Sequence, residues 1–87
     1  MYYLYILKST IKSWHYIGTS NDVEKRLKEH NFGKTKSTKA YRPLKLVYRE
    51  VFPDKVSARK RELFLKKTFK ARQEILNNID KVPSSNG

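Results

Sequence analysis

The sequence predicts an α+β fold, in which a small three-stranded antiparallel sheet is flanked by helices. Two observations lead to this prediction. Three segments are rich in Tyr, Leu, Ile and Val, as strands are, and three others place apolar residues at helical spacing. Their order along the chain is strand, strand, helix, strand, helix, helix. A small antiparallel sheet packed against helices is the economical arrangement for that order.

The first two strands are expected at Tyr2–Lys8 and Trp14–Thr19, joined by the polar segment 9–13. Two such runs with a short polar connection predict an antiparallel hairpin. If the turn is centred between residues 10 and 11, Tyr5 lies opposite Tyr16, because the residue numbers of opposed pairs in a hairpin have a constant sum. Both rings would then point to the same face of the sheet.

A short amphipathic helix is expected after the turn at Gly18. Asn21 and Glu24 are spaced as an N-cap and its capping-box partner. Val23 and Leu27 lie one turn apart and supply the apolar contacts of this helix. The chain therefore passes from strand to turn to helix within a few residues.

The segment 33–43 is expected to be a loop, because it carries four cations and no acid between Gly33 and Pro43. The third strand is expected at Leu44–Phe52, where β-branched and aromatic residues alternate with charged ones. Asp54 then caps the helix that follows.

Two further helices are expected at 55–67 and 69–79, with Thr68 as a possible cap of the second. The buried stripe of the first is expected to come from Val56, Leu63 and either Ala58 or Phe64. The second carries Phe69, Arg72, Leu76 and Ile79 at helical spacing.

A chain of 87 residues corresponds to one domain, near the lower end of what folds alone on a hydrophobic core. We expect residues 1–80 to form the domain and residues 81–87 to form a flexible C-terminal tail. The apolar run Tyr2–Leu7 is too short for a signal peptide or a membrane span, so a cytoplasmic location is expected. The absence of cysteine excludes a disulfide framework and zinc-finger modules.

The net charge of +12, from 20 Lys and Arg against 8 Asp and Glu, indicates a polyanionic partner. Nucleic acid is the first candidate. An anionic membrane surface is the second, and it is disfavoured because no segment combines a strongly apolar helical face with a basic one. A merely solubilising surface is the alternative without a partner.

Two short tyrosine motifs carry a resemblance to a known family. Tyr3-Leu4-Tyr5 is followed, after ten residues, by Tyr16-Ile17-Gly18, and then by Arg26, His30 and Glu62. This ordered set resembles the GIY-YIG nuclease domain over about residues 2–67, and the chain is similar to small bacterial GIY-YIG proteins. The module is shared with the bacterial excision-repair nuclease and phage homing endonucleases. The first motif has Tyr3 where the family has glycine, a position that supplies no chemical group.

The resemblance implies metal-assisted hydrolysis of a phosphodiester. Such cleavage requires an activated water, stabilisation of the extra negative charge on phosphoryl oxygens, and a metal or acid to support the leaving oxygen. The positions that match the family's catalytic residues are Tyr5, Tyr16, Arg26, His30 and Glu62.

Glu62 is the acid that we expect to hold the metal. It stands among Arg59, Lys60, Arg61, Lys66 and Lys67, so its carboxylate is expected to be ionised. A hard oxygen ligand suits Mg²⁺ or Mn²⁺, and one carboxylate suggests one ion. The alternative is that Glu62 only forms ion pairs with Lys66 or Arg59, which lie at helical spacing from it.

The remaining site residues supply charge and proton transfer. Arg26 presents a permanently charged fork of donors for the scissile phosphate, or else it lies on a solvated helix face. A tyrosine with a pKa near ~10 is a poor base, so Tyr5 or Tyr16 needs nearby positive charge to activate water. The resemblance implies that one of them does so. His30 titrates in the useful range and lies one turn from Arg26, although a single helix-edge histidine is more often structural.

The acid-free loop is expected to contact the phosphate backbone or, as the alternative, to be simply solvated. Its cationic residues are Lys34, Lys36, Lys39 and Arg42. Contacts of this kind position nucleic acid without reading its sequence, and no recognition helix or base-stacking signature is present.

Together with the resemblance, these features predict a divalent-metal-dependent endonuclease that acts on DNA, favoured over RNA, with little sequence specificity of its own. Repair or recombination is the expected setting, and a protein partner is the expected source of specificity. The alternative is a non-catalytic nucleic-acid-binding module for DNA or RNA that acts with partner proteins. Metal-dependent turnover distinguishes the two.

Overall fold

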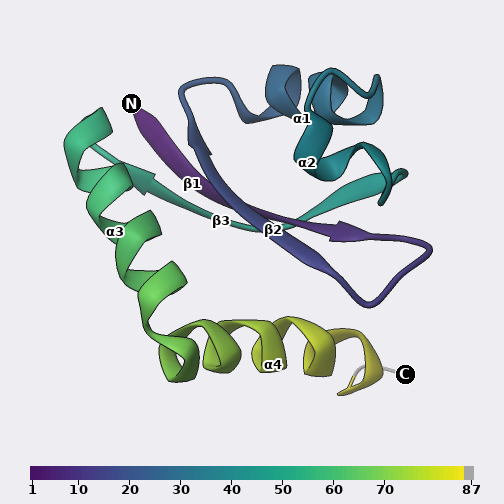
Figure 1. Cartoon of the computed structure of the whole chain (residues 1–87). Coiled ribbons are helices and arrows are strands. Elements are labelled where there is room, and N and C mark those ends of the chain that lie inside the picture. Colours follow the sequence, from purple (N-terminus) through teal and green to yellow (C-terminus); the bar gives the residue numbers. More distant parts are fainter. Residues whose placement is uncertain (86–87) are drawn as a thin grey trace.

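The computed structural model describes residues 1–85, with side chains described to residue 79, and contains one three-stranded antiparallel sheet with helices on both faces (Figure 1). The strands are β1 (Tyr2–Ser9), β2 (His15–Ser20) and β3 (Leu44–Phe52), in the spatial order β2-β1-β3. The α+β class and the three expected strands are therefore confirmed. The central strand β1 separates two edge strands.

Four helices complete the described chain: α1 (Val23–Asn31), α2 (Lys36–Lys39), α3 (Lys55–Lys67) and α4 (Phe69–Ser85). The segment expected as a loop therefore contains a short helix, α2. Helix α4 runs past its expected end at residue 79. The division into a domain and a flexible tail stays a prediction. The last residues of that tail, 86–87, lie outside the described residues. No helix within residues 1–85 combines the length and apolar character needed to cross a bilayer.

The central strand is buried on both faces. Leu4 and Ile6 pack with Leu65 of α3 and Leu76 of α4. The intervening Tyr5 belongs to a second cluster that includes Val23 of α1. This cluster lies on the opposite face of the sheet, which α1 and α2 cover (Figure 1). Because both faces are covered, the four residues from position 4 to position 7 are consecutively buried, each at most 1% exposed.

The hairpin register differs from the expected one by two residues. Tyr5 pairs with Gly18, and Tyr16 pairs with Leu7, so the prediction that Tyr5 lies opposite Tyr16 is wrong. Because side chains alternate with period two along a strand, a two-residue shift leaves every residue on its expected face. Tyr5 and Tyr16 therefore still point to the same face, as diagonal neighbours.

Ser9 accounts for the shifted register. Its backbone N–H donates to the carbonyl of Trp14 at 3.0 Å, and its hydroxyl oxygen accepts from the backbone N–H groups of Ile11 and Lys12 at 3.2 and 3.1 Å. These bonds centre the turn between residues 11 and 12 rather than between 10 and 11. Bonds between the Ser9 side chain and the backbone thus account for the register.

Helix α1 begins one residue later than expected. Its N-cap is Asp22, whose carboxylate accepts from the backbone N–H of Lys25 at 3.1 Å, so the expected pairing of Asn21 with Glu24 as a capping box is wrong. The apolar face is as expected: Val23 is 1% exposed and the half-buried Leu27 packs beside it. Asp54 caps α3 as expected, accepting from the N–H of Ser57 at 2.8 Å.

The buried stripe of α3 matches the expected one only at Ala58. Ala58 and Leu65 are fully buried, whereas Val56, Leu63 and Phe64 are 63, 48 and 47% exposed. The turn between Ala58 and Leu65 faces the sheet with half-buried charged residues, Arg61 and Glu62. Arg61 makes two bonds to Glu50 of β3, at 3.0 and 3.1 Å. Partnered charges therefore occupy positions that hydrophobic spacing assigns to apolar residues.

Candidate active site

The two motif tyrosines converge above Gly18. The rings of Tyr5 and Tyr16 have centroids 6.3 Å apart and are tilted by 41°. A Cβ at Gly18 would lie 2.8 Å from the Tyr5 hydroxyl oxygen and 2.9 Å from Cε2 of Tyr16. Such distances are shorter than van der Waals contact. Gly18 is therefore required by the space that the two rings occupy.

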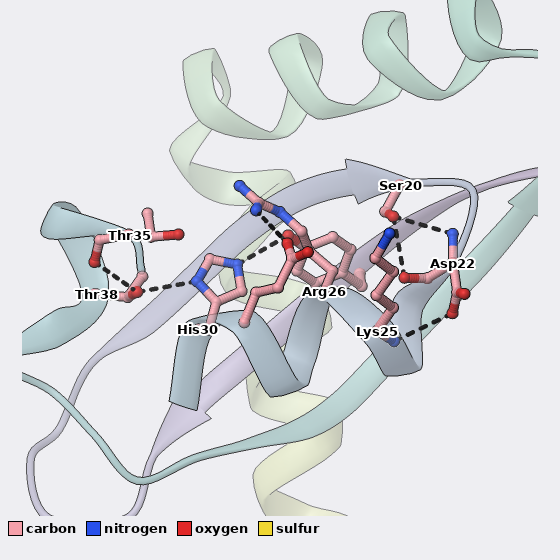
Figure 2. Close-up of polar contacts among 9 residues, drawn as sticks. Ser20, Asp22, Lys25, Arg26, His30, Thr35 and Thr38 are labelled. Atoms are coloured by element: carbon pink, nitrogen blue, oxygen red, sulfur yellow. Dashed lines mark hydrogen bonds and ion pairs between the residues drawn. The ribbon is translucent and has the colours of Figure 1, made fainter. Parts of the chain in front are cut away.

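His30 joins this pair from the last turn of α1. Its Nε2 lies 3.1 Å from the hydroxyl of Tyr5, and its ring centroid lies 4.9 Å from that of Tyr16. On its other side Nδ1 lies 2.9 Å from the hydroxyl of Thr38 in α2 (Figure 2). His30 and Thr38 are both fully buried. The imidazole is thus held from both sides between the sheet and α2.

Burial controls the ionisation of Tyr5 and His30. Burial, reinforced by the nearby Tyr16, raises the pKa of the Tyr5 hydroxyl, and Arg26 opposes this effect only in part. Burial also lowers the pKa of His30, and the positive charge of Arg26 lowers it further. At neutral pH Tyr5 is therefore protonated and His30 is neutral. A neutral imidazole next to a tyrosine hydroxyl can take its proton.

Arg26 lies one helical turn before His30 on α1 and is partly exposed (Figure 2). Its Nη1 donates to Oε1 of Glu29 at 2.8 Å, and this contact holds the pKa of the Glu29 carboxyl below its ordinary value. Arg26 also acts electrostatically on Tyr5. A guanidinium in this place can bind an anionic oxygen beside the tyrosine.

Glu62 approaches from the other side of the sheet. It lies on α3 and receives a hydrogen bond of 3.4 Å from the hydroxyl of Thr19, a residue of the edge strand β2. Lys66 Nζ lies 2.6 Å from Oε2 of Glu62, and Arg59 Nε lies 3.6 Å from Oε1. The same Lys66 lies 6.0 Å from the ring centroid of Tyr16. Because β2 is an edge strand, side chains from both faces of the sheet reach its outer edge.

Glu62 offers a single carboxylate to a hard cation. Among the described residues no group of three or more histidines and carboxylates could enclose a metal. The side chain of Glu62 is 14% exposed, and its oxygens already attract two positively charged groups. Mg²⁺ is commonly held by one or two carboxylates and keeps several waters. Glu62, with the hydroxyl of Thr19 beside it, could therefore hold such an ion.

The four cationic residues of segment 33–43 are of two kinds. Lys34, Lys36 and Lys39 are exposed and form no ion pair with a carboxylate in the described part of the chain. Arg42 is half-buried, and its guanidinium donates to the carbonyls of Lys39 at 2.9 Å and Asn31 at 3.5 Å. Arg42 thus ties the loop together. Phosphate contacts by these four residues stay a prediction.

Sequence reasoning missed two residues of this region. Thr38 lies in the segment that the sequence predicts to be a basic loop, yet its hydroxyl is buried against His30. Thr19 carries no local signal, because only the packing of α3 on β2 brings Glu62 to it. A threonine in a basic segment gives no indication of its burial, so neither contact could be found without the fold.

Comparison with known proteins decides the family. A family model described as the GIY-YIG catalytic domain matches residues 1–76. The chain belongs to the GIY-YIG family. The matched residues include both tyrosine motifs and all five expected catalytic positions. The GIY-YIG membership expected from the sequence is confirmed.

Similar GIY-YIG relatives are bacterial UPF0213 proteins. UPF0213 protein YazA of Bacillus subtilis is 39% identical over 75 residues, which cover 85% of this chain and 75% of that protein. A UPF0213 protein of Clostridium perfringens is 47% identical over 68 residues, covering 77% of this chain and 72% of the relative. The solution NMR structure of a UPF0213 protein from Bacillus halodurans matches with a TM-score of 0.53 at 33% identity, covering 90% and 83% of the two chains.

Proposed function

We propose that this GIY-YIG protein is a divalent-metal-dependent endonuclease that hydrolyses phosphodiester bonds in DNA with little sequence specificity of its own. The observation that carries the proposal is the hydrogen bond between the Tyr5 hydroxyl and the buried, neutral His30, next to Arg26. It provides a proton acceptor beside a phosphate-binding group. Cytoplasmic DNA in repair or recombination is the proposed setting.

Tyr5 is the tyrosine that we assign to the attacking water. Because its pKa is raised, the Tyr5 hydroxyl is not ionised at neutral pH. Tyr5 therefore accepts a proton from water only if it gives up its own proton at the same time. His30 Nε2, 3.1 Å away, receives that proton. The proton of the water passes to the Tyr5 oxygen, the Tyr5 proton passes to His30, and the water oxygen bonds to phosphorus as the ester bond breaks. Tyr16 borders the same space.

Arg26 supplies the positive charge for the phosphoryl oxygens. A guanidinium stays protonated and offers paired donors to an oxyanion. In the protein alone one of its nitrogens is bonded to Glu29 at 2.8 Å. This carboxylate holds the guanidinium in place beside Tyr5. The charge that develops on phosphorus-bound oxygens in the transition state is then met by a group that needs little rearrangement.

Glu62 is the residue that would hold Mg²⁺ or Mn²⁺. A bound ion would neutralise the charge on the leaving oxygen and on a non-bridging phosphoryl oxygen. Glu62 orients toward the border of β2 through Thr19, and Lys66 supplies positive charge between Glu62 and the ring of Tyr16. One carboxylate corresponds to one ion.

The surface charge supports a nucleic-acid substrate. The chain carries a net charge of +12, and Lys34, Lys36 and Lys39 present exposed ammonium groups from one loop. Such groups bind the phosphate backbone without distinguishing sequences. A protein partner is therefore our proposed source of target choice.

A second function is favoured by one observation. Both oxygens of Glu62 are engaged, one by Lys66 and the other by Arg59 and Thr19, as in a structural ion pair. If these contacts persist when nucleic acid binds, the protein is a non-catalytic module that binds DNA or RNA together with partners. Binding weakens with salt in either case, so turnover is the property that differs.

The test is a cleavage assay across substrates. Purified protein is incubated with labelled linear, branched and single-stranded DNA and with matched RNA, with Mg²⁺, with Mn²⁺ and with a chelator. We expect cleavage of DNA that requires the metal and stops on chelation. Binding without cleavage on every substrate would overturn the nuclease proposal in favour of the binding module.

A further inference from the structure

The hydroxyl of Thr38 contacts the site from a direction that the proposed reaction does not use. Thr38 is fully buried in the four-residue helix α2. Its Oγ1 lies 2.9 Å from Nδ1 of His30 (Figure 2), whereas the Tyr5 hydroxyl lies 3.1 Å from the other ring nitrogen, Nε2. Both nitrogens of the buried ring therefore have a partner.

The direction of these hydrogen bonds follows from the last acceptor in the series, which is a backbone carbonyl. The Thr38 hydroxyl donates to the backbone carbonyl of Thr35 at 3.3 Å, and a carbonyl only accepts. Since a hydroxyl has one hydrogen, its oxygen is left to accept from His30, which must then carry its proton on Nδ1. In neutral imidazole the other nitrogen, Nε2, is the acceptor. The Tyr5 hydroxyl accordingly donates to Nε2.

We propose that Thr38 is a positioning residue that fixes His30 in the Nδ1–H tautomer and so keeps Nε2 open to the proton of Tyr5. The catalytic meaning of this inference rests on the proposed function, whereas the tautomer does not. Partners of this type, which orient an imidazole through its second nitrogen, affect reactivity without touching the substrate. Helix α2 is then the support of His30, in addition to carrying Lys36 and Lys39.

The tautomer can be read directly by NMR. In protein labelled with ¹⁵N at histidine, long-range proton–nitrogen spectra distinguish a protonated ring nitrogen from an acceptor nitrogen. The chain has two histidines, so His15→Gln assigns the signals of His30. We expect Nδ1 of His30 to be protonated in the unaltered protein. An Nε2–H tautomer there would overturn the proposal without any variant.

Three variants distinguish the effect of the Thr38 hydroxyl from the effect of side-chain packing. Thr38→Val removes the hydroxyl and keeps the shape, so a buried Nδ1–H would lack an acceptor and the proton is expected to move to Nε2. Thr38→Ser keeps the hydroxyl and should keep the Nδ1–H tautomer. Thr35→Val is the matched control, because Thr35 contributes its backbone carbonyl and its side chain makes no cap hydrogen bond.

Activity supplies the second readout. We expect Thr38→Val to reduce the single-turnover cleavage rate by about 10- to 100-fold with unchanged DNA affinity, and Thr38→Ser to restore it. An unchanged tautomer and rate in folded Thr38→Val would overturn the proposal. Should that variant not fold, the unaltered protein and Thr38→Ser still decide, because an Nε2–H tautomer in either contradicts the assignment. If no form of the protein cleaves DNA, the proposed function fails while the tautomer result stands.

Discussion

Gly18 lies directly opposite Tyr5 in the hairpin of β1 and β2, and a Cβ on Gly18 would lie 2.8 Å from the Tyr5 hydroxyl oxygen. The glycine is thus a spacer for the reactive end of the tyrosine. It also leaves room for Tyr16, which lies diagonally across the same pair. The geometry of the tyrosine motifs depends on this one missing side chain.

Gly18→Ala is expected to destabilise the protein. The added methyl group would displace both rings, and overpacking of this kind costs about 1–3 kcal/mol. Urea unfolding measures the loss, and the Tyr5–His30 contact can be followed in the histidine spectra. Ser13→Ala, in the exposed hairpin loop, is the control. Wild-type stability with an intact Tyr5–His30 contact in Gly18→Ala would contradict the steric account.

The two motif tyrosines should respond differently to loss of their hydroxyls. Tyr5→Phe leaves the buried Nε2 of His30 without its partner, which costs about 1–3 kcal/mol. It should also abolish cleavage, because the proton of the attacking water passes to His30 through that hydroxyl. Tyr16→Phe is the matched comparison, and we expect a smaller loss of stability because Tyr16 is only half-buried. Equal stability losses in the two variants would count against the assigned roles.

The stability of the protein should depend on His30 in mildly acidic solution. Because its pKa in the folded protein is lowered from 6.5, the unfolded chain takes up the proton at higher pH than the folded one. The free energy of unfolding therefore rises with pH through this range. The contribution of neutral His30 is complete above about pH 6.5 and is lost as the pH falls, with a slope of at most about 1.4 kcal/mol per pH unit.

Urea unfolding across this pH range, in His30→Gln and His15→Gln, checks the assignment. The slope should disappear only in His30→Gln. The titratable and charged groups near His30 are Tyr5, Tyr16, Arg26 and Glu29. The Glu29 carboxyl, whose pKa is lowered, acts in a more acidic range, where its stabilising effect is lost as pH falls through its folded-state pKa. A slope that survives in His30→Gln would assign the effect to another group.

Lys66 should compete with a metal ion for Glu62. Its ammonium lies 2.6 Å from Oε2, so a divalent ion must displace it or share the carboxylate. Partly exposed ion pairs are worth up to about 1 kcal/mol, so Lys66→Met should tighten Mn²⁺ binding by about two- to fivefold. Calorimetry or Mn²⁺ resonance measures this without any substrate. Lys67→Met, an exposed neighbour, is the control, and equal affinities in both variants would refute the competition.

Part of this site could be predicted because it depends on local pattern. The strands follow from composition, and the shared face of Tyr5 and Tyr16 follows from the period of two. The exact register does not, because the hydroxyl of Ser9 bonds within the turn and moves its centre. Two bonds between one side chain and the backbone outweighed the simplest turn geometry.

The parts that escaped prediction depend on tertiary contacts. The inward stripe of α3 includes Arg61 and Glu62, which become favourable there only because Glu50 and Thr19 of the sheet meet them. Thr38 reads as a solvated loop residue until α2 buries it against His30. Polar residues at such positions carry no hydrophobic signal, so their burial follows from the fold alone.

The central claim is that Glu62 serves metal-dependent cleavage, and Glu62→Gln tests it most directly. Single-turnover cleavage and equilibrium binding are measured on the same labelled DNA with Mg²⁺, beside Glu74→Gln, an exposed acid on α4. The account predicts that Glu62→Gln binds DNA with nearly unchanged affinity and does not cleave it, whereas Glu74→Gln cleaves normally. Full cleavage by Glu62→Gln would contradict the account.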